Sequence, residues 1–207
     1  RGPEMSREPK DIVGEIEKLV VRGIREVTLL GQNVNSYGKK SEGEKDFVSL
    51  LKKINEIEGI ERIRFTTSHP KDLSDELISC FGSLHKLCRH IHLPVQSGSN
   101  RILKRMNRGY TAEEYLEKVA RLRRVCPEIS ITSDVIVGFP GETQKDYQET
   151  IDMMEKIRFD SLFSFKYSER KGTAAGALTG KVTEAEKRLR LKELQALQDR
   201  HTQEKNT

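Results

Sequence analysis

Residues 111–143 read TAEEYLEKVARLRRVCPEISITSDVIVGFPGET, and this stretch decides the fold. Its first part repeats apolar side chains at helical spacing behind a capping box of Thr111 and Glu114, which predicts an amphipathic helix over 112–126. Residues 130–137 are rich in β-branched types and predict a buried strand, which ends in a glycine-rich turn. Helix, strand and turn in this order form one repeat of an α/β protein.

The same alternation covers most of the chain. Further strands are predicted at residues 26–30 (EVTLL), 62–67 (RIRFTT), 90–95 (HIHLPV) and 160–165 (DSLFSF). Repeated strand–helix steps imply a parallel sheet with helices outside it, either open or closed into a barrel. In both cases ligands bind at the carboxyl ends of the strands. After the last strand, a loop leads to a basic helix that is capped by Thr183 and Glu186 and runs to about residue 200.

Composition limits the class of protein. The 207 residues suffice for one substantial domain, and a charged share of 33% indicates a large solvated surface. No apolar run reaches about 18 residues, so we expect no membrane span. The start, RGPEMSREPK, has no initiator Met and no signal sequence, so we expect a piece of a longer protein. The net charge of +5 is concentrated towards the C-terminus, which suits either a nucleic-acid contact or a solvated helix face.

The cysteines and the other reactive side chains give no catalytic set. Cys80, Cys88 and Cys126 have neither a zinc nor an iron–sulfur spacing, and their sparse, odd number favours a reducing compartment. No Ser/His/Asp, Cys/His or paired-carboxylate arrangement can be assembled from the sequence. We therefore predict no catalytic residue and no metal ligand in this chain.

Two strand-end loops carry small polar groups that suit a bound metabolite. The segment LLGQNVNSYG places Gln32, Asn33 and Asn35 close together, and their amides can both donate to and accept from an amino-acid zwitterion. An ordinary Asn/Gly turn would have the same composition. In DVIVGFPGET the glycines at 138 and 141 would let a flat ring approach the backbone.

The loop HLPVQSGSNRILKRMNR, over residues 92–108, combines a polar and a basic part. The polar part, with Gln96, Ser97 and Gly98, suits a ribose or a carboxylate. The basic part holds Arg101, Lys104, Arg105 and Arg108 without an acidic residue among them. This cluster predicts an RNA contact, although basic residues one helical turn apart also occur on solvated faces. Arg170, in the loop after the last strand, is a further candidate.

Five segments together resemble one family. RGPEMSR, LLGQNVNSYG, FTTSHP, HLPVQSGSNRILKRMNRGYT and DVIVGFPGET stand in the order and spacing of the radical-SAM methylthiotransferases, from residue 1 to about residue 171. The resemblance implies an α/β fold, a partial (βα) barrel that binds S-adenosylmethionine and a 4Fe–4S cluster. The cluster cysteines of the family precede its RG-x-E-x-SR segment, so they and the first strand are expected before Arg1. An N-terminal domain with an auxiliary cluster and a downstream RNA-binding domain are also implied.

The resemblance assigns roles to three sets of residues. The positions that meet the methionine amino group are Gln32, Asn33 and Asn35. The positions near the ribose and carboxylate are Gln96, Ser97 and Gly98. The segment that flanks the adenine is Val135, Ile136, Val137 and Gly138. One departure concerns the last loop, where Glu169 and Lys171 replace two prolines of the family, so this loop is expected to be more mobile.

The implied reaction is 2-methylthiolation of N6-isopentenyladenosine in tRNA, in which a reduced cluster cleaves S-adenosylmethionine and the resulting radical removes hydrogen from C2. The implied partners are tRNA and an electron donor, and we expect a cytoplasmic monomer. Residues 1–171 would form the radical-SAM core, and residues 172–207 a loop and basic helix leading to the RNA-binding domain. Without the cluster cysteines, this chain alone is predicted to be inactive.

Other substrates and classes remain open. Within the family, the substrate could be threonylcarbamoyladenosine in tRNA or an aspartate of a ribosomal protein. A threonylcarbamoyl carboxylate would need a buried cation, and none stands in residues 31–37, which favours the isopentenyl branch. Outside the family, a metal-free βα-barrel enzyme such as an aldolase or a non-enzymatic RNA-binding module would suit the composition.

Overall fold

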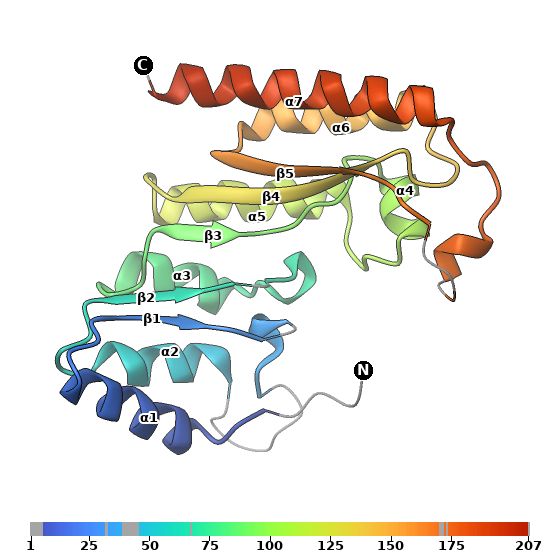
Figure 1. Ribbon diagram of the computed structural model, residues 1–207. Helices are drawn as coiled ribbons and strands as arrows, with labels where there is room; N and C mark the ends of the chain where they lie inside the picture. Colours follow the sequence, from blue (N-terminus) through green and yellow to red (C-terminus); the bar gives the residue numbers. More distant parts are fainter. Residues whose placement is uncertain are drawn as a thin grey trace. The chain divides into compact units, whose positions relative to one another are not determined.

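Figure 1 shows the computed structural model, which describes residues 6–31, 33–38, 46–66, 68–169, 172 and 174–206. The chain divides into two compact units, Arg1–Ile91 with Arg121–Ile129 and His92–Ala120 with Ser130–Thr207. Both units are built from parallel strands and helices, as the α/β class requires. Among the described residues, no helix is both long and apolar enough to cross a membrane.

The first unit is built around a two-stranded parallel sheet. Its elements are α1 (Pro9–Val21), β1 (Glu26–Leu29), the 3-10 helix η1 (Val34–Ser36), α2 (Phe47–Asn55), β2 (Arg62–Phe65), η2 (Pro70–Asp72) and α3 (Asp75–Ser83). In the sheet Val27 lies beside Ile63 and Leu29 beside Phe65. The Phe65 ring meets Phe47 of α2 edge-on, with 5.1 Å between ring centroids, and Ile63 is fully buried. These apolar contacts hold α2 on the sheet.

The second unit holds the other sheet, in the strand order β3–β4–β5. Its elements are β3 (His90–His92, which begins in the first unit), α4 (Asn100–Arg105), α5 (Ala112–Val125, which ends in the first unit), β4 (Ser130–Val137), α6 (Gln144–Ile157), β5 (Ser161–Lys166), η3 (Ala174–Ala177) and α7 (Glu184–Asn206). Strands β4 and β5 are parallel. Helix α7 runs along β5 beside α6 (Figure 1).

The alternation of side chains along β4 decides which face of this sheet is covered. Ile131, Ser133, Val135 and Val137 are buried, whereas the residues between them are only half-buried. The buried face packs on helices, where Tyr115 of α5 donates a 2.6 Å hydrogen bond from its hydroxyl to the Leu93 carbonyl. This is the pattern expected for a sheet with one face in the core.

The predicted strands and capping boxes are confirmed, with small shifts at their ends. Strand β3 ends at His92 rather than at residue 95, because Pro94 has no N–H to donate to a ladder. Helix α7 continues to Asn206 rather than stopping near residue 200. The expected α/β fold with parallel strands is confirmed, with its strands divided between two parallel sheets, and the described residues contain no closed barrel.

Candidate functional site

The loop after β1 holds buried amides whose hydrogen bonds are incomplete. Asn35 is 4% exposed, and neither its amide nitrogen nor its oxygen has a partner within the described part of the chain. The side-chain oxygen of Asn33 and the hydroxyl of Ser68 are in the same situation, while the Asn33 amide donates 2.5 Å to Asp72. Gln32 lies outside the described residues. Leaving buried polar atoms unpaired is costly, so this loop suits a ligand with both donors and acceptors.

The polar loop after β3 is largely used to build the second unit itself. The Gly98 N–H donates 2.9 Å to the Thr150 hydroxyl on α6, and the buried Ser97 hydroxyl lies 3.4 Å from the same oxygen. Gln96 differs from both, because its φ of +70° lies in the left-handed region and its half-buried side chain is unbonded within the described residues. Such a strained conformation of a non-glycine residue is typical of functional sites. Of these three residues, Gln96 alone offers a free side chain to a ligand.

The segment Val135–Gly138 divides between the two faces of the sheet. Val135 and Val137 are at most 1% exposed and belong to the helix-covered core, whereas Ile136 points to the other face. Gly138 has a φ of +73°, and a Cβ there would lie 2.3 Å from Cγ of Lys187. The glycine therefore makes room for a lysine of α7.

A buried ion pair fixes the turn between β4 and α6. One carboxylate oxygen of Glu142 accepts hydrogen bonds from the backbone N–H groups of Gly138 (2.8 Å) and Phe139 (3.3 Å). The other lies 3.1 Å from the Arg190 guanidinium, and the two side chains are only 4% and 6% exposed. Arg190 therefore belongs to the core, whereas the basic composition of the last helix suggested a solvated side chain. The sequence spacing could have indicated this burial, because Arg190 falls on the same helical stripe as the buried Leu194 and Leu197.

A second buried carboxylate joins this turn to α4. Asp146 forms a capping box with Thr143 at the start of α6 and accepts 2.7 Å from the Ser99 hydroxyl and 3.1 Å from Arg101 Nε. Burial opposes its ionisation, but the hydrogen bonds from Arg101, Thr143 and Ser99 dominate and hold the pKa of Asp146 well below its usual range. Its charged form is therefore part of the folded structure.

We expect Asp146→Asn to lower the free energy of unfolding by about 2 kcal/mol at neutral pH. Because folding lowers the pKa of Asp146, its stabilisation is present above the unfolded pKa of about 3.9 and is lost as the pH falls below it. Urea unfolding of the chain at pH 7 and pH 3 measures this, and the loss on acidification should shrink in the variant. Asp152→Asn, at an exposed position of the same helix, is the control. Equal acid sensitivity of wild type and Asp146→Asn would contradict the role.

The basic cluster on α4 is mostly engaged within the protein. Besides the contacts of Arg101 with Asp146, Arg105 donates 3.1 Å to the Pro140 carbonyl and 3.4 Å to the Thr179 carbonyl. Arg108 donates 3.3 Å to the Tyr110 hydroxyl. Lys104 is exposed and makes no such contact within the described residues, and Arg170 lies outside them. Three of the predicted RNA contacts thus also hold their own loops in place.

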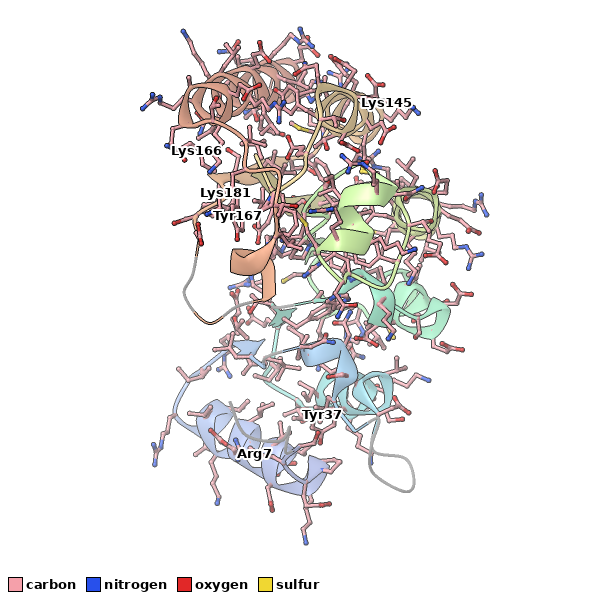
Figure 2. All side chains as sticks on the ribbon, turned by 90° about the vertical axis from the view of Figure 1, so that its right-hand side faces the viewer. Arg7, Tyr37, Lys145, Lys166, Tyr167 and Lys181 are labelled. Carbon is pink, nitrogen blue, oxygen red and sulfur yellow. The ribbon has the colours of Figure 1, made fainter. Side chains whose placement is uncertain are left out.

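Lys166, Tyr167 and Lys181 lie close together near the end of β5, as Figure 2 shows. Lys166 and Lys187 share the carboxylate of Glu184, at 3.1 and 2.9 Å, and Lys187 also donates 3.2 Å to the Tyr167 carbonyl. The Tyr167 ring meets Phe139 edge-on at 5.1 Å, and its buried hydroxyl has no partner among the described residues. The last strand-end loop is therefore tied to the β4–α6 turn through α7.

The three cysteines are free, with Cys80 and Cys126 buried and Cys88 half-buried. Burial raises the pKa of the Cys80 thiol, which makes it a poorer thiolate ligand. In the part of the chain that the structure describes, no group of three or more His, Cys, Asp or Glu side chains could hold a metal ion. These residues do not fit an iron–sulfur cluster.

Solved structures with low sequence identity share the fold. Coproporphyrinogen III oxidase from Escherichia coli, described as a radical SAM enzyme, superposes with a TM-score of 0.69 over 93% of this chain and 46% of its own, at 16% identity. Methylornithine synthase superposes with a TM-score of 0.55 over 95% of this chain and 56% of its own, at 12% identity. Both likenesses support the expected α/β architecture of the radical-SAM type.

Sequence relatives are much closer. The chain is 66% identical over 206 residues to the tRNA-2-methylthio-N(6)-dimethylallyladenosine synthase of Syntrophus aciditrophicus, and 58% identical to the synthase of the same name from Geobacter sulfurreducens. Both matches cover all of this chain but only 45% and 46% of the relatives, so the chain spans about half their length. The family model of the Radical SAM superfamily matches residues 1–154. The resemblance seen in the loop motifs is thereby confirmed, and the chain belongs to the Radical SAM superfamily.

Proposed function

We propose that this chain is the central part of an enzyme that methylthiolates C2 of N6-dimethylallyladenosine in tRNA. The observation that carries the proposal is the 66% identity, along the whole chain, to a synthase named for that product. The reaction would take tRNA as substrate and an electron donor as partner, in the cytoplasm and as a monomer.

The chain's own residues suit the binding of S-adenosylmethionine in two places. In the first unit, the unpaired amide of Asn35 and the unpaired side-chain oxygen of Asn33 offer a donor and acceptors to the amino-acid part, next to Gln32. In the second unit, Gln96 and Ile136 lie side by side, since the Ile136 N–H donates 3.0 Å to the Gln96 carbonyl. We propose that Ser97, Gly98, Val135, Val137 and Gly138 hold this loop in position for the nucleoside part.

S-adenosylmethionine, with an iron–sulfur cluster bound by residues outside this chain, would supply the radical chemistry. The share of the chain is to orient the cofactor and to exclude water around it. The Glu142–Arg190 pair and the Asp146 cap serve this by fixing the β4–α6 turn directly after the proposed nucleoside contacts. On its own, the chain would therefore bind S-adenosylmethionine but would not catalyse the radical reaction.

We further propose residues 1–171 as the radical-SAM core and residues 172–207 as an extension towards an RNA-binding domain. The RNA surface would include Arg101, Lys104, Arg105, Arg108 and Arg170. Lys104 supports this best among the described members, because its ammonium group is exposed and unengaged. Each arginine has five N–H donors, and those that make no hydrogen bond within the protein would contact phosphate.

The activity is tested with the full-length protein, a reductant and S-adenosylmethionine. We expect the 2-methylthio product from tRNA that carries N6-dimethylallyladenosine and none from tRNA that carries threonylcarbamoyladenosine, because the first modification is apolar and the second is a carboxylate. Nucleoside mass spectrometry after digestion measures both. Product only from threonylcarbamoyl-tRNA, or only on a ribosomal protein, would overturn the proposed substrate and leave the fold assignment intact.

A further inference from the structure

Two phenylalanines of the second unit are exposed side by side. The chain has seven phenylalanines, and five of them (Phe47, Phe65, Phe81, Phe139 and Phe159) are at most 5% exposed. Phe163 and Phe165 of β5 are 56% and 53% exposed. They are two residues apart in one strand, so both rings stand on the same face of the sheet, about 6.6 Å from each other along the strand. Two large apolar side chains grouped in this way mark a binding surface more often than isolated ones do.

The neighbouring strand makes this face polar at one end and apolar at the other. In the parallel register Asp134 lies beside Phe163, and Ile136 lies beside Phe165. These β4 residues are half-buried, in contrast to Val135 and Val137, which point to the helix-covered face. One end of the surface therefore pairs the Asp134 carboxylate with the Phe163 ring. The other end, two residues further along the strands, pairs Ile136 with Phe165.

A histidine completes the polar end. His92 Nδ1 lies 2.9 Å from the Thr132 hydroxyl, and Nε2 lies 3.4 Å from the Asp134 carboxylate. The imidazole also meets the Phe163 ring edge-on, with 6.0 Å between centroids. These contacts fix the orientation of His92 and hold Asp134 next to Phe163. The result is a hydrogen-bond acceptor placed directly beside an exposed aromatic face.

We propose that this face binds the modified base of the RNA substrate, with the purine stacked on Phe163 and the dimethylallyl chain against Phe165. A purine has a π-face for stacking, and its N6–H can donate a hydrogen bond to the Asp134 carboxylate. The alkenyl group beyond N6 is apolar and would cover the second ring, which a bare adenine would leave exposed. The proposal rests on the proposed function and names the residues that would select its substrate.

The test compares the affinity of the full-length protein for two anticodon stem-loop RNAs, one with dimethylallyladenosine and one with adenosine at the target position. Phe163→Ser should weaken binding of both RNAs about tenfold, because stacking is lost. Phe165→Ser should weaken only the modified RNA, and so reduce the preference for the dimethylallyl group about tenfold. Phe163→Trp keeps an aromatic ring for stacking and should bind both RNAs about as tightly as the wild type does. Leu189→Ser, at a residue of α7 that is 58% exposed, is the matched control and should change neither affinity.

The outcomes separate this inference from the function on which it rests. Wild-type protein that yields the methylthio product, together with phenylalanine variants that bind both RNAs as wild type does, would overturn the inference alone. Loss of S-adenosylmethionine binding in the variants, with an unchanged RNA preference, would assign the face to the cofactor and also overturn it. Absence of product and of RNA preference in the wild type would overturn the proposed function itself. Equal melting temperatures of the variants exclude unfolding as the cause.

Discussion

Glu142→Ala is expected to lower the free energy of unfolding by about 3–5 kcal/mol, because it leaves the Arg190 guanidinium buried without its counter-charge. The guanidinium would keep the 3.3 Å hydrogen bond to the carbonyl of residue 142 and its place over the Tyr147 ring, but neither supplies a counter-charge. The N–H groups of Gly138 and Phe139 would lose their acceptor. Urea denaturation of the chain, followed by circular dichroism, measures the loss.

Two further variants test the physical reason for this loss. Replacing both partners, as Glu142→Leu with Arg190→Met, should recover most of the stability, because no buried charge remains. Lys181→Ala breaks an ion pair whose side chains are 64% and 49% exposed, and it should lower the free energy of unfolding far less than Glu142→Ala does. If the double variant were as unstable as Glu142→Ala, the backbone contacts of Glu142, rather than the buried charge of Arg190, would explain the loss.

Gly98→Ala is expected to destabilise the chain by about 3 kcal/mol. A Cβ at this position would lie 2.5 Å from the Glu149 carbonyl oxygen and 2.6 Å from the Thr150 Cα. Both atoms belong to the backbone of α6, so no flexible side chain can move aside, and the 2.9 Å hydrogen bond from the Gly98 N–H to Thr150 would be strained. The melting temperature of the variant measures the effect.

Gly14→Ala provides the matched control for this substitution. Gly14 lies inside α1 with nothing within 4 Å of an added Cβ, so alanine there should stabilise the chain by about 0.5–1 kcal/mol through its higher helix propensity. Opposite signs for the same chemical change would show that the packing of the strand-end loop on α6 is the cause. A Gly98→Ala variant as stable as the wild type would show that the loop can move away from α6.

Sequence periodicity predicted the elements because it is a local signal. The alternation in residues 130–137 reports a strand with one buried face, and the structure confirms both the strand and the burial of Val135 and Val137. The capping boxes of Thr111 and Thr183 are likewise confirmed, since they depend on residues three apart. The number of sheets was not predictable in this way, because strand pairing joins segments far apart in the chain.

The candidate site was only partly accessible from the sequence for the same reason. The loop motifs identified the right segments, but the role of a residue within a motif depends on what folds against it. Gly138 faces Lys187, and Gly98 faces α6, so both glycines are needed for close contacts with residues that lie far along the chain. The exposed pair Phe163 and Phe165 appeared in the sequence as ordinary core residues of a strand.

The position of α7 also bears on how this protein can be cut into working pieces. The family match ends at residue 154, yet the core of the second unit also includes Phe159, just before β5, and Leu194 and Leu197 of α7. A recombinant fragment trimmed to the match would uncover one whole side of β4 and leave it as a bare sheet edge, which invites aggregation. A fragment meant to stay folded should therefore keep the chain through Asn206, although the family match alone would suggest a shorter one.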